Sequence, residues 1–454
     1  MSKKYSVKHD NRNITSDIDQ AIESGPVNSR RAWLSIGVIV ILMILSQIDR
    51  NSISLLVDPI RSSFGISDFQ IGLLQGPAFA IFFLLGSLLV GWMVDKYSKR
   101  WLIYIGVTVW SLATIASGLA GGFVALIAAR CFVGLGESVL QPAGWSMIAR
   151  LFPARKLATA IGVLTAGTQV GAAMSFMLVG FLVAEADQFS TTAIPLTGKL
   201  LPWQFVFIAT GLPGVFLAFL IFLVPKDKAT GLSIEKSSTG GLIEFMRENR
   251  AFLTYHFLGF GVLSILVHGV AAWAPTYLMR IHGIDVKDIG ILVGLIVIPL
   301  GVGGAVFAGW LVDRSFQKGK HDAHLSHFAI RCAAITILGA VGFIFDSTLI
   351  FTVVCFGLIQ FIQPFSGVAG ASLQISTPEQ YRGRISGIFI MFYNAVGLML
   401  GPSFVALLSD SLGPDKLGIA MAINYMFFGS VAALLLWLGR RHVVVPKGLM
   451  AAVA

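Results

Sequence analysis

Two near copies of one hexapeptide, GWMVDK at residues 91–96 and GWLVDR at residues 309–314, lie 218 residues apart in this chain. Each copy ends a long apolar run and begins a basic loop. The segments 153–162 and 378–387 repeat a second pattern at a similar offset, since each begins with proline and ends with glycine. The sequence therefore predicts two halves of similar length, which is typical of membrane transporters built from structural repeats.

The composition is that of a membrane protein. Hydrophobic residues make up 56 % of the chain and charged residues only 12 %, with a mean hydropathy of +0.80, whereas soluble domains carry about 25 % charged residues. A helix needs about 20 apolar residues to cross a bilayer. Such runs lie near residues 33–57, 69–94, 101–120, 123–150, 157–184, 203–224, 251–279, 289–312, 328–345, 348–376, 384–408 and 417–438. We predict an all-α membrane protein with twelve transmembrane helices in two six-helix bundles related by pseudo-two-fold symmetry.

The distribution of polar segments predicts the domains and the topology. The expected order is a cytoplasmic tail (1–32), a six-helix bundle (33–224), a cytoplasmic linker (225–250), a second six-helix bundle (251–441) and a cytoplasmic tail (442–454). Most of the 33 lysines and arginines lie in the tails and in the loops after even-numbered spans. By the positive-inside rule, both termini are then cytoplasmic. We expect a multi-pass protein of the inner (plasma) membrane, whose net charge of +10 needs no nucleic-acid partner.

Four strongly ionisable residues lie deep in the predicted spans: Asp49 and Arg50 in the first, Arg130 and Glu137 in the fourth. Each would cost roughly 2.5–3.5 kcal/mol at the bilayer centre, so they must pair or face water. Arg130 and Glu137 are seven residues apart and share one helix face, about 10 Å apart along the axis. We expect them to form two stations along one cavity, with Asp49 and Arg50 contributed by a neighbouring helix. The alternative is a structural salt-bridge cluster.

The second half has no acidic or basic residue deep in its spans apart from His256 and His268. Polar and aromatic residues near helix middles would suit contacts with the neutral part of a substrate. The candidates in both halves are Gln141, Gln169, His268, Trp273, Tyr277, Gln360, Gln363, Tyr393 and Asn394. The alternative for most of them is hydrogen bonding between helices.

Motifs for other activities are missing from the sequence. It has no Gly-x4-Gly-Lys-Ser/Thr loop for ATP and no His-Glu-x-x-His, and its spans contain no cluster of histidines and cysteines. We therefore expect no cofactor, no metal site and no enzymatic activity.

Two motifs resemble the major facilitator superfamily. The segment 91–100 resembles the loop motif between the second and third helices of that family, and 309–314 is similar to a second copy. Arg130-x-x-x-Gly134-x-Gly136-Glu137 resembles its fourth-helix motif. The resemblance implies a gating role for Gly91, Asp95, Lys96, Lys99, Arg100, Gly309, Asp313 and Arg314. In this role Asp95 would bond the N-terminus of a helix from the other half and latch one conformation.

Two branches of the superfamily share these features. Asp49-Arg50 followed by ISDFQIGL at residues 66–73 looks most like the Spinster-like branch, which implies proton-linked movement of lysolipids and sphingolipid-like amphiphiles. The anion:cation symporter branch, whose members take sugar acids and other organic anions, shares the four membrane charges. Those charges do not separate the two branches.

The function that uses all of these features is secondary active transport by alternating access. Asp49 and Glu137 would be the proton-coupling residues, and Arg50 and Arg130 the substrate anchors or their counter-ions. We expect a proton-coupled carrier of an amphiphilic or organic anion, with a proton symporter of sugar acids or other carboxylates as the alternative. A channel and a transport-dead receptor are remoter alternatives. The expected partners are the lipid bilayer, the anionic substrate and protons, and we expect the protein to act as a monomer.

Overall fold

The computed structural model describes residues 29–152, 154–189, 193–194, 198–225, 239–345 and 348–443, so most of the two predicted tails and residues 226–238 of the predicted linker lie outside it. The first half contains α2 (Ser29–Phe64), α3 (Asp68–Gln75), α4 (Pro77–Lys96), α5 (Lys99–Gly118), α6 (Phe123–Glu137), α7 (Leu140–Leu151), α8 (Ala154–Phe189), β1 (Ala193–Ile194), β2 (Gly198–Lys199), α9 (Pro202–Leu217) and η1 (Ala218–Leu223). The second half contains α10 (Thr239–Glu248), α11 (Arg250–His282), α12 (Val286–Gln317), α13 (Ala323–Ile344), α14 (Leu349–Ile362), α15 (Ser366–Ser376), α16 (Glu379–Leu412), η2 (Pro414–Lys416), α17 (Leu417–Asn424), η3 (Tyr425–Gly429), α18 (Ser430–Gly439) and η4 (Arg440–His442).

The predicted helical membrane fold is confirmed. Eleven helical segments in the described part are long and apolar enough to cross a membrane. The remaining predicted span corresponds to α8, a helix of 36 residues with a described apolar segment at Val170–Ala186. The small antiparallel pair β1–β2 lies in the loop between α8 and α9.

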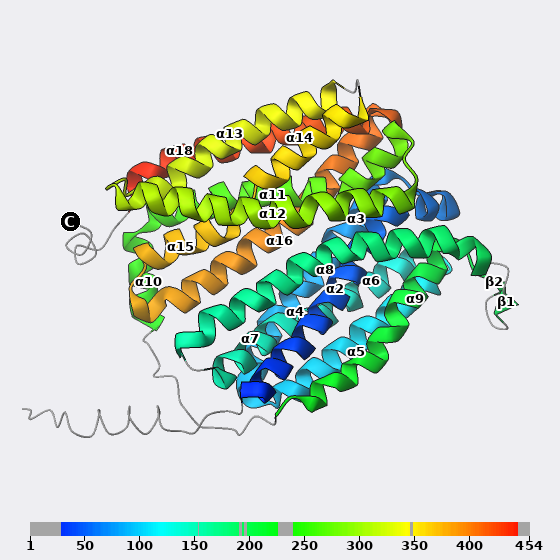
Figure 1. Ribbon diagram of the computed structural model, residues 1–454, viewed down its shortest axis with the longest axis horizontal. Helices are drawn as coiled ribbons and strands as arrows, with labels where there is room; N and C mark the ends of the chain where they lie inside the picture. The colour runs from blue at the N-terminus through cyan, green and yellow to red at the C-terminus, as the bar shows by residue number, and fades with distance from the viewer. Residues whose placement is uncertain are drawn as a thin grey trace, which may run out of the picture.

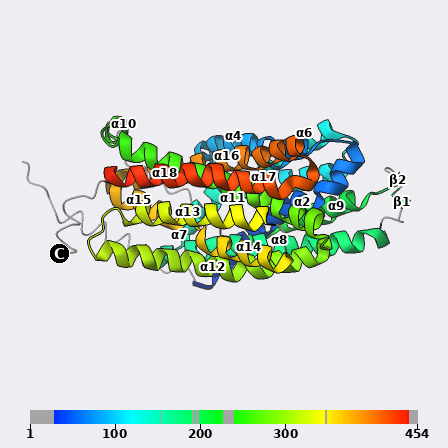
Figure 2. The same ribbon diagram turned by 90° about the horizontal axis from the view of Figure 1, so that it is seen from above.

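The helices run roughly along one axis in two bundles. Figures 1 and 2 show α10 at one end of the molecule, here called the proximal end, and β1–β2 at the other, here called the distal end. Helices α2 to α9 form one bundle and α11 to α18 the other (Figure 1). The bundles meet where α2 packs against α11, α8 against α12, and α3 and α4 against α16.

Three spans are broken within the bundles. The second is interrupted at Gly76, the fourth between α6 and α7, and the tenth between α14 and α15, where Pro364 removes a backbone donor. Helix α6 ends at Glu137 and α14 ends at Ile362, and these two residues are as far apart in the sequence as Pro153 and Pro378. The breaks in the fourth and tenth spans are therefore at equivalent positions in the two halves. Non-helical backbone at membrane depth is tolerated where it faces a cavity or protein, so these breaks mark the interior of each bundle.

Close backbone contacts join the bundles in their distal parts. A Cβ added at Gly72 in α3 would lie 2.6 Å from the Cβ of Ala406 and 3.1 Å from the carbonyl oxygen of Pro402 in α16. One added at Gly290 in α12 would collide with the carbonyl oxygen of Phe176 in α8. Only glycine permits both approaches, so two helix pairs are closed against each other at the distal end.

Candidate functional site

The four predicted membrane charges come together at the contact between α2 and α6. Arg50 Nη2 lies 2.7 Å from Glu137 Oε2. The Glu137 side chain is fully buried, whereas the Arg50 side chain is 28 % exposed. The structure thus brings the charges of two helices together, and their role as stations along a cavity stays a prediction. Ion pairs of this kind are strong when water is excluded from one partner.

The position of Glu137 at the end of α6 shapes its contacts. Oε2 accepts a hydrogen bond from Ser46 Oγ at 2.8 Å in addition to the bond from Arg50. Oε1 is buried and has no hydrogen-bond partner among the residues that the structure describes. One oxygen thus makes both bonds, and the other is available to a proton without the loss of an existing contact.

Asp49 is also fully buried, but within the described part of the chain neither oxygen of its carboxylate makes a hydrogen bond. Arg130, likewise buried, donates from Nη1 to the backbone carbonyl of Asp49 at 3.3 Å. Arg130 therefore holds the α2 backbone, and Asp49 keeps two unused acceptor oxygens inside the protein. Such unsatisfied buried groups are rare in folded proteins and call for a functional explanation.

Arg50 connects this cluster to a cavity. Its guanidinium lies over the rings of Phe79, 4.8 Å from the centroid, and Phe83, 5.4 Å from the centroid. Phe83 also lines a cavity of about 520 Å³ between α4, α7, α10 and α16, in the proximal part of the molecule. The partly exposed arginine thus lies beside the inner wall of that cavity.

The cavity is mainly apolar. Its apolar walls include Leu84, Trp145, Met391 and Leu398, and Leu242 of α10 reaches its edge. Its polar lining residues are Ser87, Gln141, Arg384 and Asn394. Among the neutral candidates from the sequence, Gln141 and Asn394 therefore face the cavity. The Asn394 amide also donates to the carbonyl of Ile390 at 2.9 Å, which orients it within α16.

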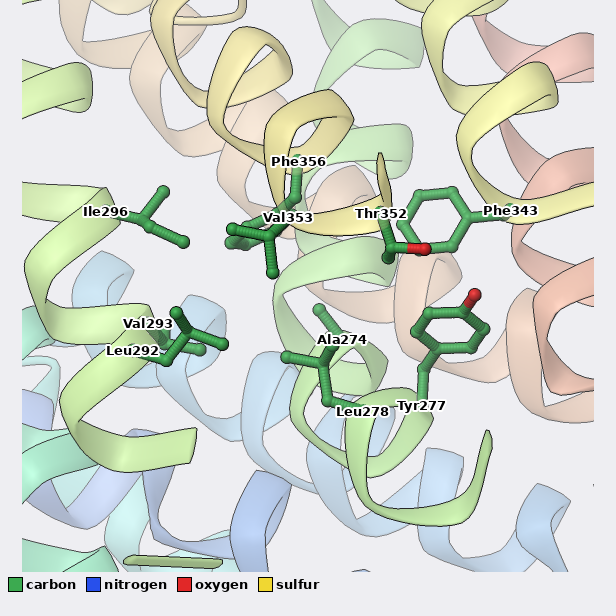
Figure 3. Close-up of a pocket in the computed structure, with 10 residues that line it drawn as sticks. All are labelled: Ala274, Tyr277, Leu278, Leu292, Val293, Ile296, Phe343, Thr352, Val353 and Phe356. Atoms are coloured by element: carbon green, nitrogen blue, oxygen red, sulfur yellow. The ribbon is translucent and has the colours of Figure 1, made fainter. Parts of the chain in front are cut away.

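Two aromatic candidates lie in contacts between helices, away from this cavity. Trp273 is fully buried and donates from Nε1 to the carbonyl oxygen of Pro402 at 2.9 Å, tying α11 to α16. Tyr277 packs edge-on against Phe343, with ring centroids 5.0 Å apart. Figure 3 shows the rings of Tyr277 and Phe343 beside Thr352, at a second pocket. The volume of this pocket, about 10 Å³, is too small for a substrate.

The other candidates occupy the interior of the second half. Gln360 and Gln363 bond to each other at the break between α14 and α15. Tyr393 packs against the rings of Phe365 and Phe389. The side chain of Gln169 lies outside the described residues.

His268 is bonded within its own helix. Its Nδ1 lies 2.9 Å from the Ser264 carbonyl and 3.1 Å from Ser264 Oγ. Because a carbonyl only accepts, Nδ1 donates to it, and Nε2 is the acceptor nitrogen when the ring is neutral.

One membrane-embedded arginine was missed. Arg331 lies inside the predicted span 328–345 but was not expected to lie deep in the protein, whereas in α13 it is buried and donates from Nη1 to the Ile362 carbonyl at 2.9 Å. It thereby satisfies the last carbonyl of α14 at the helix break. Its guanidinium also lies 5.5 Å from the ring centroid of Phe328. We therefore correct the expectation that no arginine lies deep in the second half: Arg331 supports the broken tenth span. Its role was missed because it is close in the sequence to a basic loop.

The predicted gating residues lie at equivalent helix ends. Gly91, Asp95 and Lys96 are in the last turns of α4, and Gly309, Asp313 and Arg314 are in the last turns of α12. Lys99 and Arg100 begin α5, and Arg100 Nη2 donates to the Phe222 carbonyl at 2.6 Å. The side chain of Asp95 lies outside the described residues.

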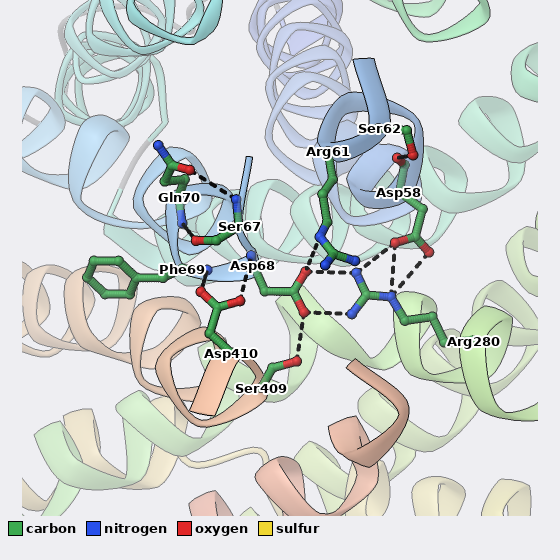
Figure 4. Close-up of polar contacts among 10 residues, drawn as sticks. All are labelled: Asp58, Arg61, Ser62, Ser67, Asp68, Phe69, Gln70, Arg280, Ser409 and Asp410. Carbon is green, nitrogen blue, oxygen red and sulfur yellow. Dashed lines mark hydrogen bonds and ion pairs between the residues drawn. The ribbon is translucent and has the colours of Figure 1, made fainter. Parts of the chain in front are cut away.

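A second polar network at the distal end was not predicted. Figure 4 shows Arg280 of α11 between Asp58 of α2 and Asp68 of α3, with Asp410 of α16 at the start of α3. Arg280 Nη2 lies 2.6 Å from Asp58 Oδ1, and Nη1 lies 2.7 Å from Asp68 Oδ2. Asp68 belongs to the segment 66–73 that carries the family resemblance, but its separation of 342 residues from Asp410 gave no sign of contact.

Comparisons with known proteins agree with the fold. The Major Facilitator Superfamily profile matches residues 39–402. An MFS-type efflux pump of Mycolicibacterium smegmatis is 26 % identical over 434 residues, which cover 93 % of this chain and 95 % of that protein. The D-galactonate transporter of Escherichia coli is 25 % identical over 415 residues, or 86 % of this chain and 92 % of that protein.

A solved structure with a similar fold is a bacterial homolog of the human lysosomal transporter Spinster, in an inward-facing and unoccupied conformation. Its TM-score is 0.81 at 20 % identity, with 92 % of this chain and 98 % of that chain covered.

Proposed function

The chain belongs to the Major Facilitator Superfamily, and we propose that it moves an amphiphilic organic anion by alternating access and couples this movement to protons. As a member of that family it is a membrane transporter and not an enzyme. The observation that carries the proposal is the buried charge cluster of α2 and α6, with Arg50 beside a largely apolar cavity.

Glu137 and Asp49 are the proposed proton sites. A proton on Glu137 would remove the charge that holds Arg50 and would free that guanidinium to bind a substrate anion. Asp49 has two buried oxygens without donors, so a proton can bind there without breaking a hydrogen bond. Proton and substrate would thus affect each other's affinity reciprocally.

The lining of the cavity supports an amphiphile. Apolar walls stabilise a hydrocarbon chain by removing it from water, at about 0.8 kcal/mol for each buried CH₂. Arg50 at the inner wall supplies positive charge for a phosphate or carboxylate. A single-chain anionic lipid has both features.

The second candidate is a symporter of sugar acids. The four membrane charges and the likeness to the D-galactonate transporter favour it. A sugar acid, however, needs several polar partners for its hydroxyl groups, and the described cavity offers few besides Ser87, Gln141 and Asn394.

The direct test uses the purified protein in liposomes that contain a pH-sensitive dye. We expect a lysophosphatidic acid or lysophosphatidylglycerol probe to cause proton movement that needs the protein, while D-galactonate causes little. The reverse order would favour the sugar-acid symporter. Movement with neither probe, although the fold is intact, would contradict both candidates.

The proposed cellular setting follows from the positive-inside distribution of charge. We propose cytoplasmic termini, a plasma-membrane location and a monomeric transport unit. Under this topology the proximal end faces the cytoplasm. Labelling a single cysteine at the exposed Lys318, in the loop between α12 and α13, tests the orientation: a membrane-impermeant maleimide should react only in opened cells or inverted vesicles.

A further inference from the structure

Several hydrogen bonds join the two halves at the distal end, where α3 meets α16 and α2 meets α11. We propose that Asp410 and Arg280 form a lock that holds this end closed, and that the Asp410 part of it is the counterpart of the predicted Asp95 latch on the antiparallel pair formed by the second span and α16. The proposal rests on alternating access and deepens it, since it names the residues that bias one of the two states.

Arg280 provides the first part of the lock. Its guanidinium comes from the second half and bonds two carboxylates of the first half. Nη1 and Nη2 donate to Asp68 at 2.7 and 2.8 Å, and Nε and Nη2 donate to Asp58 at 2.9 and 2.6 Å. Asp68 and Arg280 are both well buried, whereas Asp58 is partly exposed. Two forked pairs on one arginine fix the distance and the orientation of three helices at once.

Asp410 provides the second part by capping a helix of the other half. The first N–H groups of a helix lack partners within the helix. In α3, Ser67 Oγ accepts from the Gln70 N–H. The Asp68 and Phe69 N–H groups donate instead to Asp410 Oδ1 and Oδ2, at 2.9 and 2.8 Å. Separation of the halves would therefore leave two backbone donors and one carboxylate without partners.

Asp68 is the point where both parts meet. Its N–H is held by Asp410, and its carboxylate is held by Arg280 and by Ser409 Oγ at 2.7 Å. Three side chains of the second half thus converge on one residue of the first half (Figure 4). Arg61, which lies 3.5 Å from the same carboxylate, belongs to the first half and moves with it.

The direction of the helices explains the relationship to Asp95. The second span runs from the distal to the proximal end, and α16 runs the opposite way. Asp410 lies near the C-terminus of α16, and Asp95 lies near the C-terminus of α4. An acidic residue at that position disfavours its own helix but favours the N-terminus of an antiparallel neighbour. Closure of the distal end uses Asp410 on α3. Closure of the proximal end would use Asp95 on α16, which begins at Glu379.

The experiment measures the equilibrium between the distally open and distally closed conformations, in the absence of substrate and of a proton gradient. Spin labels on paired cysteines at the distal ends report the fraction of distally open molecules by pulsed electron paramagnetic resonance in nanodiscs. We expect Asp410→Asn and Arg280→Gln to raise the open-to-closed ratio about tenfold each, since each removes charged hydrogen bonds between the halves. Ser409→Ala should shift it less, in the same direction.

Arg61→Gln is the matched control, because it removes a positive charge from the same carboxylate within one half and should leave the ratio unchanged. Asp95→Asn should lower the ratio, and the double variant Asp95→Asn, Asp410→Asn should return near the wild-type value. An unchanged ratio in Asp410→Asn, an equal shift in Arg61→Gln or no compensation in the double variant would overturn the proposal. If Arg280→Gln does not fold, Asp410→Asn and Ser409→Ala, checked by melting temperature, still decide it. Failure of lipid transport alone would leave these ratios unaffected.

Discussion

Arg50 and Glu137, 87 positions apart in the chain, form a 2.7 Å ion pair at the place where the fourth span breaks. The break exposes the end of α6 to α2, so Glu137 accepts from Arg50 and Ser46 through one oxygen. The pair thereby joins a helix interruption, a buried acid and a partly exposed arginine beside the cavity. In the proposed mechanism, this combination lets protonation of Glu137 control whether a substrate anion can bind the Arg50 guanidinium.

We predict that Glu137→Gln abolishes accumulation driven by a pH gradient but keeps exchange of substrate across the membrane. Glutamine cannot bind or release the proton, whereas exchange needs no net proton release. Uptake and counterflow in proteoliposomes measure the two activities. Asp415→Asn, an exposed acid in η2, is the control and should behave as wild type. Normal gradient-driven accumulation in Glu137→Gln would contradict the assignment.

Asp49→Asn is expected to abolish proton-driven accumulation as well, and to leave the melting temperature unchanged or raise it by a few degrees. The native carboxyl group is buried without a hydrogen bond within the described residues, so its replacement breaks no hydrogen bond and removes an ionisable group from the interior. Thermal unfolding in detergent, together with uptake, measures both effects. A large drop in melting temperature with intact coupling would indicate a structural role instead.

Arg130 gives a graded prediction. Arg130→Ala removes the donor to the Asp49 carbonyl and leaves a void between α2 and α6, so we expect a loss of about 2–4 kcal/mol in stability and weaker anion binding. Arg130→Lys keeps the charge but loses the planar fork, so its effect on binding should be smaller. Thermal shift with and without an anionic lysolipid measures both quantities. Wild-type stability and wild-type anion affinity in Arg130→Ala would exclude both roles.

The charge cluster could be predicted because charged residues in apolar spans are rare and have a high free-energy cost in the membrane. The distal lock could not, since Asp58, Asp68 and Arg280 lie at span ends, where polar residues are common. Their importance depends on which helices meet, and that is decided by packing over more than 200 residues. The role of Arg331 was not predicted for a related reason. The free-energy cost of burying its guanidinium is offset by a hydrogen bond to a backbone carbonyl, which is available only because the helix breaks after α14.

The neutral candidates show a different limit. Periodicity places Trp273, Tyr277 and Asn394 near helix middles but does not tell which face points to the cavity. The cavity lies between α4, α7, α10 and α16, and Asn394 lines it, whereas Trp273 donates a hydrogen bond to the Pro402 carbonyl. Aromatic residues with a polar atom suit both roles, because each provides apolar area and one hydrogen bond.

Filling the cavity should distinguish the two candidate substrate classes. Gly387 lines the cavity, and a Cβ there would meet no atom within 4 Å. Gly387→Leu should therefore fold normally and occupy space that a hydrocarbon chain needs. We expect the apparent affinity for a long-chain lysolipid to fall at least about tenfold, which matches the loss of about two buried CH₂ groups. The affinity for a short-chain analogue with the same headgroup should change little. Gly367→Leu is the control, since Gly367 has equally open surroundings but does not line the cavity. Equal losses for long and short chains in Gly387→Leu would place the acyl chain outside this cavity and would favour a small polar substrate.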